Sequence, residues 1–160
     1  MNTFKLAVLV SGRGSNLQAI IDSIEREELD ASISIVISNT RDAMALQRAE
    51  EHEIKTIFID PAKHIDNKEY DKALTDKLKE YSIDLVCLAG YMRILGEEVI
   101  QTFEKKIINI HPSLLPAFPG LNAQKKAIEH GVKFSGCTVH FVDLGVDSGP
   151  IILQTVVPVY

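Results

Sequence analysis

Two polar side chains at the end of an apolar run are the clearest chemical signal in the sequence. Asn109 and His111 are separated by one residue, and side chains alternate along a strand, so both are expected on one face. Pro112 cannot donate to a strand ladder, which predicts that the strand ends at His111. Burying polar groups without partners costs stability, so this pair favours a reactive site. A purely structural bond from His111 to a loop carbonyl remains the alternative.

Asp147 is the residue expected to complete this site. It lies in a glycine-containing loop, residues 143–150, where a carboxylate could orient His111 and favour its imidazolium form. Acyl transfer to an amine needs donors for an oxyanion, which Asn109 and protonated His111 could supply. It also needs a base for the attacking nitrogen, and Asp147 is the natural candidate, directly or through a water. Asp143 is a weaker candidate for the base and is expected on the solvent side of the loop.

A second histidine, His140, follows in the same part of the sequence. His140 alternates with Val139 and Phe141, and we predict a structural or supporting role for it. His111, His140 and Asp147 match no standard zinc-ligand spacing, so we predict no metal.

A glycine-containing turn near the amino terminus predicts an anion site. Ser11-Gly12-Arg13-Gly14-Ser15-Asn16 follows an apolar strand and leads directly into a helix. Glycines let backbone amides approach a ligand, and a helix amino terminus favours negative charge. Ser15 and Asn16 are also candidate helix caps. A dinucleotide motif would need a third glycine where Leu17 stands, and an acidic residue after the second strand, so a monophosphate is favoured over NAD. A tight turn without a ligand is the structural alternative.

The elements that must position these residues alternate along the chain. Continuous apolar strands are predicted at 6–10, 33–37, 56–59 and 85–89, with amphipathic helices between them. A short helix at 97–103, a strand at 106–110 and a helix at 123–130 follow, and then two strands at 136–142 and 151–157. This pattern predicts an α/β, doubly wound, Rossmann-like mixed sheet, mostly parallel with an antiparallel edge. Ligands in such folds bind beyond the carboxyl ends of the strands, which predicts a site in the loops after strands one, four and five.

Composition narrows the function class. The 160 residues fit one domain, and the net charge of −5 argues against nucleic acid as a partner. No segment reaches membrane-spanning length, and no membrane partner is expected. The cysteines Cys87 and Cys137 lie in apolar strands, which predicts buried, reduced thiols and a cytoplasmic protein.

Taken together, the sequence resembles the folate-dependent glycinamide ribonucleotide formyltransferases of purine synthesis, over essentially its whole length. The resemblance rests on four segments: residues 11–17, 90–95, 109–120 and 139–150. It implies transfer of a formyl group from 10-formyltetrahydrofolate, as co-substrate, to the amine of glycinamide ribonucleotide. It also implies a monomer or homodimer without a metal.

The resemblance assigns roles residue by residue. Asn109, His111 and Asp147 match the catalytic trio, and Gly14, Ser15 and Asn16 match the segment that holds the substrate phosphate. The segment expected to line the folate pocket contains Met92, Arg93, Ile94 and Leu95, with Asp143 and Val146 on the opposite wall. Residues 1–105 would then form the ribonucleotide-binding half of a single domain, and residues 106–160 the catalytic and folate-binding half.

Related folate enzymes are the alternatives. Formyltetrahydrofolate deformylase shares the trio but normally carries an amino-terminal regulatory domain, and methionyl-tRNA formyltransferase carries a further domain and a basic surface. A non-catalytic nucleotide-binding module is the alternative from another class, and the trio speaks against it. Family chains usually continue past residue 160 into a carboxyl-terminal helix that contacts the ribonucleotide. The 160-residue sequence stops before that helix, so its contacts with the ribonucleotide are not expected here.

Overall fold

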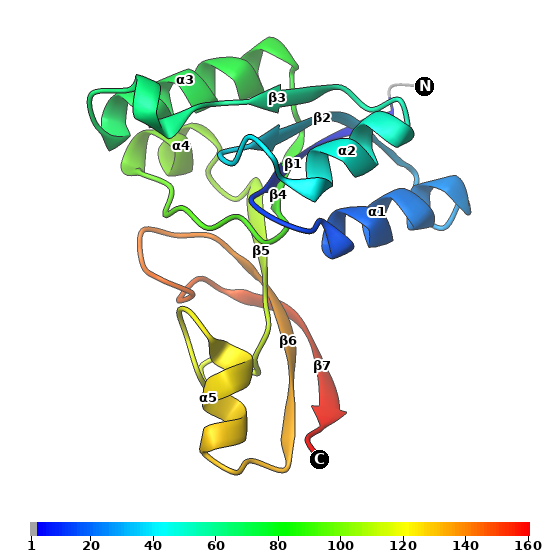
Figure 1. The fold of residues 1–160 in the computed structure, drawn as a ribbon, viewed down its shortest axis with the longest axis vertical. Helices are drawn as coiled ribbons and strands as arrows, with labels where there is room; N and C mark the ends of the chain where they lie inside the picture. The colour runs from blue at the N-terminus through cyan, green and yellow to red at the C-terminus, as the bar shows by residue number, and fades with distance from the viewer. Residues whose placement is uncertain (1–2) are drawn as a thin grey trace.

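Alternating strands and helices build the first part of the molecule. The computed structural model describes residues 3–160 (Figure 1). Its first elements are β1 (Phe4–Val10), α1 (Ser15–Glu25), β2 (Ala31–Ser38), α2 (Met44–Glu51), β3 (Thr56–Phe58), the 3-10 helix η1 (Pro61–Lys63), α3 (Asn67–Glu80) and β4 (Leu85–Leu88). Each predicted strand in this part is present within about two residues of its expected ends. The short 3-10 turn η1 was not predicted.

The second part supplies the edge of the sheet. Its elements are α4 (Glu97–Thr102), β5 (Ile107–His111), α5 (Ala123–Glu129), β6 (Phe134–Phe141) and β7 (Ile151–Pro158). Strand β5 ends at His111, as Pro112 predicted. Strands β6 and β7 form a long hairpin that, with α5, projects from the rest of the molecule (Figure 1).

The strand order within residues 3–160 is β3-β2-β1-β4-β5-β6-β7. Strands β1 to β5 are parallel, and β6 and β7 join antiparallel. This confirms the predicted mixed, doubly wound sheet. The chain moves outward from β1 through β2 to β3 and then returns to the other side of β1 with β4. The carboxyl ends of β1 and β4 therefore flank the point where strand order reverses, which is where α/β folds bind ligands.

Both faces of this sheet are covered, which explains the continuous apolar strands. Alternate β1 residues belong to two buried clusters. Leu6 and Val8 pack with residues of α1 and α2, while Ala7 and Leu9 pack with residues of α3 and α4. The sheet is thus a rigid platform from which the loops at its carboxyl edge extend.

Strand β7 differs from the central strands because all eight of its residues are exposed. Several aliphatic side chains of β7 are about half exposed or more: Ile151, Ile152, Leu153, Val156 and Val157. In the part of the chain that the structure describes, no helix is both long and apolar enough to span a membrane.

Candidate active site

A cleft of about 850 Å³ lies at the carboxyl ends of β1, β4 and β5. Its walls come from four loops, those after β1, β4, β5 and β6. The predicted site residues that line it are Ser15, Asn16, Met92, Arg93, Ile94, Leu95, Asn109, His111, His140, Asp143, Val146 and Asp147. The structure therefore gathers residues that are up to about 130 positions apart in the sequence.

His111 is held between two acceptors at the end of β5. Its Nδ1 lies 3.2 Å from Asp147 Oδ2, and its Nε2 lies 2.9 Å from the carbonyl oxygen of Phe118. A neutral imidazole has one N–H, whereas an imidazolium donates from both nitrogens. Each ring nitrogen of His111 therefore lies within hydrogen-bond distance of an acceptor. The side chain is 6% exposed, so water competes little for these bonds.

Asp147 joins three separate parts of the site. Besides His111, its Oδ2 accepts a hydrogen bond from the Gly120 backbone amide at 2.8 Å. Its Oδ1 lies 3.5 Å from Asn109 Nδ2. Asp147 has a φ of 52°, a left-handed conformation that aspartate tolerates better than most residues. Such strained backbone is found preferentially at functional sites.

His140 supports Asn109 from the neighbouring strand. Its Nδ1 lies 2.9 Å from the carbonyl oxygen of Phe141, and its Nε2 lies 3.2 Å from Asn109 Nδ2. A carbonyl can only accept, so Nδ1 carries the proton and Nε2 accepts from the Asn109 amide. One neutral tautomer satisfies both contacts and orients the Asn109 side chain. A supporting role for His140 in the reaction stays a prediction.

The loop after β5 is fixed to the hairpin by side chains that the sequence did not single out. Buried Thr138 donates through its hydroxyl to the Ser113 carbonyl at 2.7 Å and accepts from the Leu115 amide at 3.1 Å. Gln154 of β7 donates to the Leu115 carbonyl at 2.9 Å. These bonds hold the loop that carries Phe118 and Gly120, and therefore the partners of His111 and Asp147.

The turn after β1 has the form expected of an anion site. Gly14 is buried, has a φ of +75°, and is the N-cap of α1. The expectation that Ser15 and Asn16 cap α1 was wrong: both lie inside the helix, and among the described residues no side chain caps it. The amides of Ser15, Asn16 and Leu17 therefore have no intrahelical acceptor. Both Ser15 and Asn16 are exposed and line the cleft.

Arg48 and Ser11 hold this turn from two sides, and neither was predicted. Arg48 Nε donates to the Arg13 carbonyl at 2.8 Å. The Ser11 hydroxyl donates to Asn39 Oδ1 and accepts from the Met92 amide at 2.8 Å. Ser11 thus joins the turn after β1 to the loop after β4. The polar segment after the second strand, which includes Asn39, was the available sequence signal.

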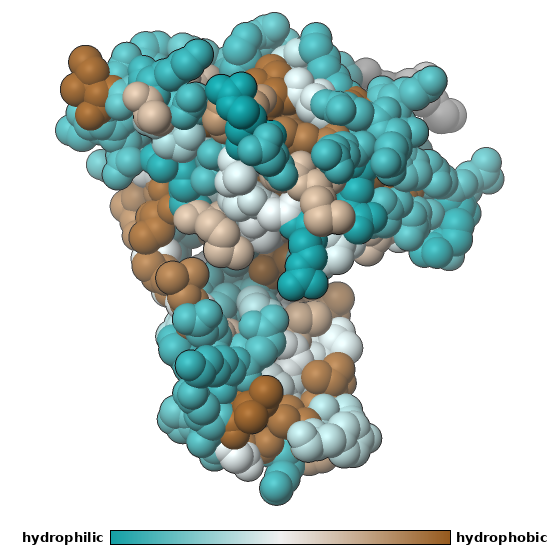
Figure 2. Space-filling model, viewed as in Figure 1, coloured by the Kyte–Doolittle hydropathy of each residue, from teal (hydrophilic) through white to brown (hydrophobic). Residues whose placement is uncertain are grey.

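The other end of the cleft is apolar. Met92, Ile94, Leu121 and Val146 line it, although each is between 56% and 76% exposed. Figure 2 shows hydrophobic side chains along the flank where the loops after β4 and β6 meet in Figure 1. An exposed apolar group beside polar residues is typical of a ligand site. This apolar end of the cleft suits a flat ring system better than a phosphate.

Asp143 and Cys137 differ partly from what was expected. Asp143 is half-buried and its Oδ1 accepts from the Gly145 amide and the Ser148 hydroxyl, so it orders the loop around Val146. Cys137 is half-buried and lines the cleft, whereas Cys87 is buried; both are free thiols. The prediction of two buried cysteines was therefore wrong for Cys137, because its strand lies near the edge of the sheet.

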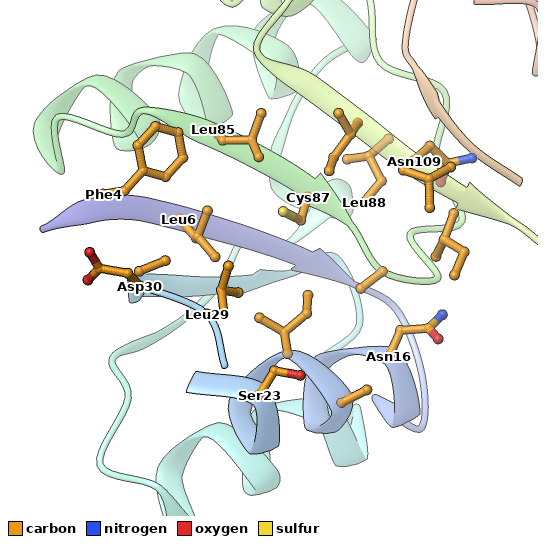
Figure 3. A pocket seen from close by; sticks show the side chains of 17 residues that line it. Phe4, Leu6, Asn16, Ser23, Leu29, Asp30, Leu85, Cys87, Leu88 and Asn109 are labelled. Atoms are coloured by element: carbon orange, nitrogen blue, oxygen red, sulfur yellow. The ribbon is translucent and has the colours of Figure 1, made fainter. Parts of the chain in front are cut away.

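A second hollow, of about 480 Å³, lies between α1 and the neighbouring face of the sheet (Figure 3). Its lining is mostly aliphatic, and Leu6, Leu85 and Cys87 point into it. Asn16 and Asn109 lie at one end and also line the cleft. Within residues 3–160, no group of three His, Cys, Asp or Glu side chains is arranged to hold a metal ion.

Comparison with known proteins gives consistent matches. Residues 4–160 match the family described as Formyl transferase. The chain is 51% identical over 155 residues to the trifunctional purine biosynthetic protein adenosine-3 of Homo sapiens; the match covers 97% of the chain and 15% of the human protein. It is 47% identical to the phosphoribosylglycinamide formyltransferase of Haemophilus influenzae, covering 98% of the chain and 74% of that protein.

The fold is shared with solved structures. The glycinamide ribonucleotide transformylase 1 of Symbiobacterium toebii superposes with a TM-score of 0.97 at 50% identity, covering 99% of this chain and 74% of that one.

Proposed function

The chain belongs to the formyl transferase family, and we propose that it transfers the formyl group of 10-formyltetrahydrofolate to the amine of glycinamide ribonucleotide. The support comes from relatives whose names state formyl transfer to glycinamide ribonucleotide, and from the cleft itself. The cleft combines an anion-binding turn, a polar centre and an apolar end, in that order. The two free thiols suit a reducing compartment, and we place the reaction in the cytoplasm.

The proposed reaction is a direct transfer. The neutral amine of the ribonucleotide attacks the formyl carbon, and the carbonyl oxygen becomes an oxyanion as the new C–N bond forms. The Asn109 amide and His111 donate to this oxyanion. Since His111 Nε2 donates to the Phe118 carbonyl in the free enzyme, this bond is exchanged for one to the oxyanion during the reaction.

Proton transfer completes the cycle. Asp147 takes the proton that the attacking nitrogen loses, directly or through a water. The oxyanion then re-forms the C=O bond as the bond between the formyl carbon and the folate nitrogen breaks, and that nitrogen takes the proton that Asp147 had accepted. Asp147 also holds His111 through the 3.2 Å contact, so the carboxylate positions the group that stabilises the oxyanion.

The two substrates occupy opposite ends of the cleft in this proposal. The phosphate lies on the amides of Ser15 and Asn16, where the helix terminus favours an anion. The pterin ring lies between Met92–Leu95 and the loop at Asp143 and Val146, where the lining is apolar. The observation that carries the proposal is the placement of Asn109, His111 and Asp147 between these two ends.

Asn16→Ala tests the assignment of the two ends. Removing the side chain beside the phosphate is expected to weaken ribonucleotide binding about 10- to 150-fold, since a hydrogen bond to a charged group contributes about 1.5–3 kcal/mol. Binding of a non-reactive folate analogue should be unchanged. Calorimetric titration with each ligand measures both. Weaker folate binding with unchanged ribonucleotide binding would reverse the assignment.

A further inference from the structure

The loop after β4, residues 89–96, is built with alternate buried and exposed side chains. Tyr91 and Leu95 are buried, while Met92 and Ile94 are 66% and 76% exposed into the cleft. Contacts on the buried side of the loop must therefore hold its backbone and its exposed residues in position. The element beneath it is the amino-terminal half of α3.

Three α3 residues contact this loop. Tyr70 is 1% exposed; its hydroxyl lies 2.8 Å from the Tyr91 hydroxyl, and its ring lies 4.2 Å from the Arg93 guanidinium carbon. Arg93 also donates to Asn67 Oδ1 at 2.8 Å. Asp71 Oδ2 accepts from the Gly96 amide at 3.0 Å. The contacts are spread over the loop from Tyr91 to Gly96, so they hold both its middle and its carboxyl-terminal end.

Asp71 is the unusual member of this group. It is 5% exposed and lines neither cavity. Burial raises its carboxyl pKa; the hydrogen bond from the Gly96 amide and the charge of Arg93 oppose that rise, and Glu98 adds the smallest effect, which raises the pKa. A buried carboxylate costs stability relative to an apolar residue, so its presence calls for another explanation.

Gly96 shows how closely the two elements approach. A Cβ at this position would collide with Asp71 Oδ2. The amide of Gly96 therefore reaches the carboxylate because no side chain intervenes. Gly96 is also the residue that caps α4, so the Asp71 contact fixes the point where the loop becomes helix.

We propose that Asp71, supported by Tyr70, is a positioning residue that holds the folate-binding loop at 89–96 without touching either substrate. This inference rests on the proposed function of the cleft. In this proposal, the α3 side chains fix the position of the Met92–Leu95 backbone relative to the cleft. The folate site would then depend on a helix that lies outside it.

Asp71→Ala tests the inference, with Asp71→Asn as the conservative variant. Loss of the acceptor for the Gly96 amide should raise KM for 10-formyltetrahydrofolate about tenfold, the effect of one hydrogen bond at the upper end of its usual range. KM for the ribonucleotide and kcat should stay near wild type. Asp71→Asn retains an oxygen acceptor and should restore most of the folate KM.

Thr75→Val is the matched control. Thr75 is one turn further along α3, is fully buried, and its hydroxyl has no hydrogen-bond partner among the described residues. Its replacement perturbs the same helix but should leave the folate KM unchanged. If Asp71→Ala fails to fold, Tyr70→Phe replaces it; that variant removes the bond to Tyr91 but keeps the ring beneath Arg93, and should raise the folate KM a few-fold.

Amide hydrogen exchange gives a readout that does not need activity. Asp71→Ala should speed exchange at residues 90–96 and leave the amides of α2 unchanged. Faster exchange in a chain that transfers no formyl group would contradict the proposed function but support the proposal that Asp71 holds the loop at 89–96. An active Asp71→Ala enzyme with an unchanged folate KM and unchanged exchange would overturn the proposal that Asp71 holds this loop. An equal rise of folate KM in Thr75→Val would also overturn it, since the effect would then be general to α3.

Discussion

At the scale of residues, His111 is the side chain whose contacts most directly determine a measurable outcome. It faces Asp147 on one side and the Phe118 carbonyl on the other, in a setting with little water. The ring is thus held in place before any substrate arrives. In the proposed mechanism, the rearrangement that remains at His111 is the exchange of its Nε2 hydrogen bond from the Phe118 carbonyl to the oxyanion.

His111→Ala should therefore lower turnover about 100- to 10,000-fold, the range found for acid–base groups, while the circular dichroism spectrum stays unchanged. Steady-state assays measure the effect. His52→Ala is the control: its ring contacts Glu25 and Gln18, away from the cleft, and it should turn over at close to the wild-type rate. A His111→Ala enzyme of normal rate would remove His111 from the mechanism.

The two cysteines should differ in reactivity. Burial raises the pKa of the Cys87 thiol to about 11, so at pH 8 almost none of it is the reactive thiolate. Cys137 is half-buried and lines the cleft. Iodoacetamide at pH 8 should modify Cys137 first, and a bound folate analogue should slow that reaction. Peptide mass spectrometry measures both sites; equal labelling of the two would contradict the burial of Cys87.

Asn109 and His111 could be singled out from the sequence because they are polar residues in an apolar strand, and Asp147 because it lies in a glycine-containing loop. Their catalytic roles stay predictions, and the residues that hold the neighbouring loops were not singled out. Ser11 and Arg48 are missed because their partners lie 81 and 35 residues away. Only the fold brings such partners together, and neither residue type is unusual at its position.

At the scale of elements, the turn after β1 depends on a single glycine. Gly14 has a φ of +75°, and a Cβ there would lie 2.6 Å from Ala45 Cβ. The close approach of α2 to this turn is what allows the Ala45 amide to donate to the Gly12 carbonyl at 3.0 Å. The proposed phosphate site and the packing of α2 therefore share one residue.

Gly14→Ala should destabilise the protein by at least about 1–2 kcal/mol through backbone conformation alone, and it should weaken ribonucleotide binding as well. Thermal unfolding should show this as a loss of roughly 2–4 °C per kcal/mol. Gly12→Ala is the matched control, because no heavy atom among the described residues lies within 4 Å of its added Cβ. A Gly14→Ala protein as stable as Gly12→Ala would contradict the packing described here.

Most elements could be predicted because their periodicity is strong, as in α3, where Tyr70, Leu74 and Leu78 recur at helical spacing on a buried face. The start of α1 could not be predicted in detail. Ser15 and Asn16 are good capping residues, and yet a left-handed Gly14 precedes them and takes the cap position. Their side chains are thereby free to face the cleft. The capping prediction was wrong at the position where we propose that the phosphate binds.

At the scale of the whole molecule, the site depends on the order of the strands. Strand β1 lies between β2 and β4, so the turn after β1 and the loop after β4 meet at the point of reversal. The antiparallel hairpin then brings Asp147 back to His111 across 36 residues. The sequence predicted a mixed sheet and its antiparallel edge. The pairing of particular neighbours is a long-range property, and only the structure shows which loops share the cleft.

The most direct test of the proposed function is loss of the formyl group from 10-formyltetrahydrofolate, followed by absorbance, with and without glycinamide ribonucleotide. The proposal predicts turnover only when the ribonucleotide is present, with one formylated ribonucleotide formed for each folate deformylated. Turnover that is equally fast without the ribonucleotide would contradict the proposal, since water rather than the amine would then be the acceptor.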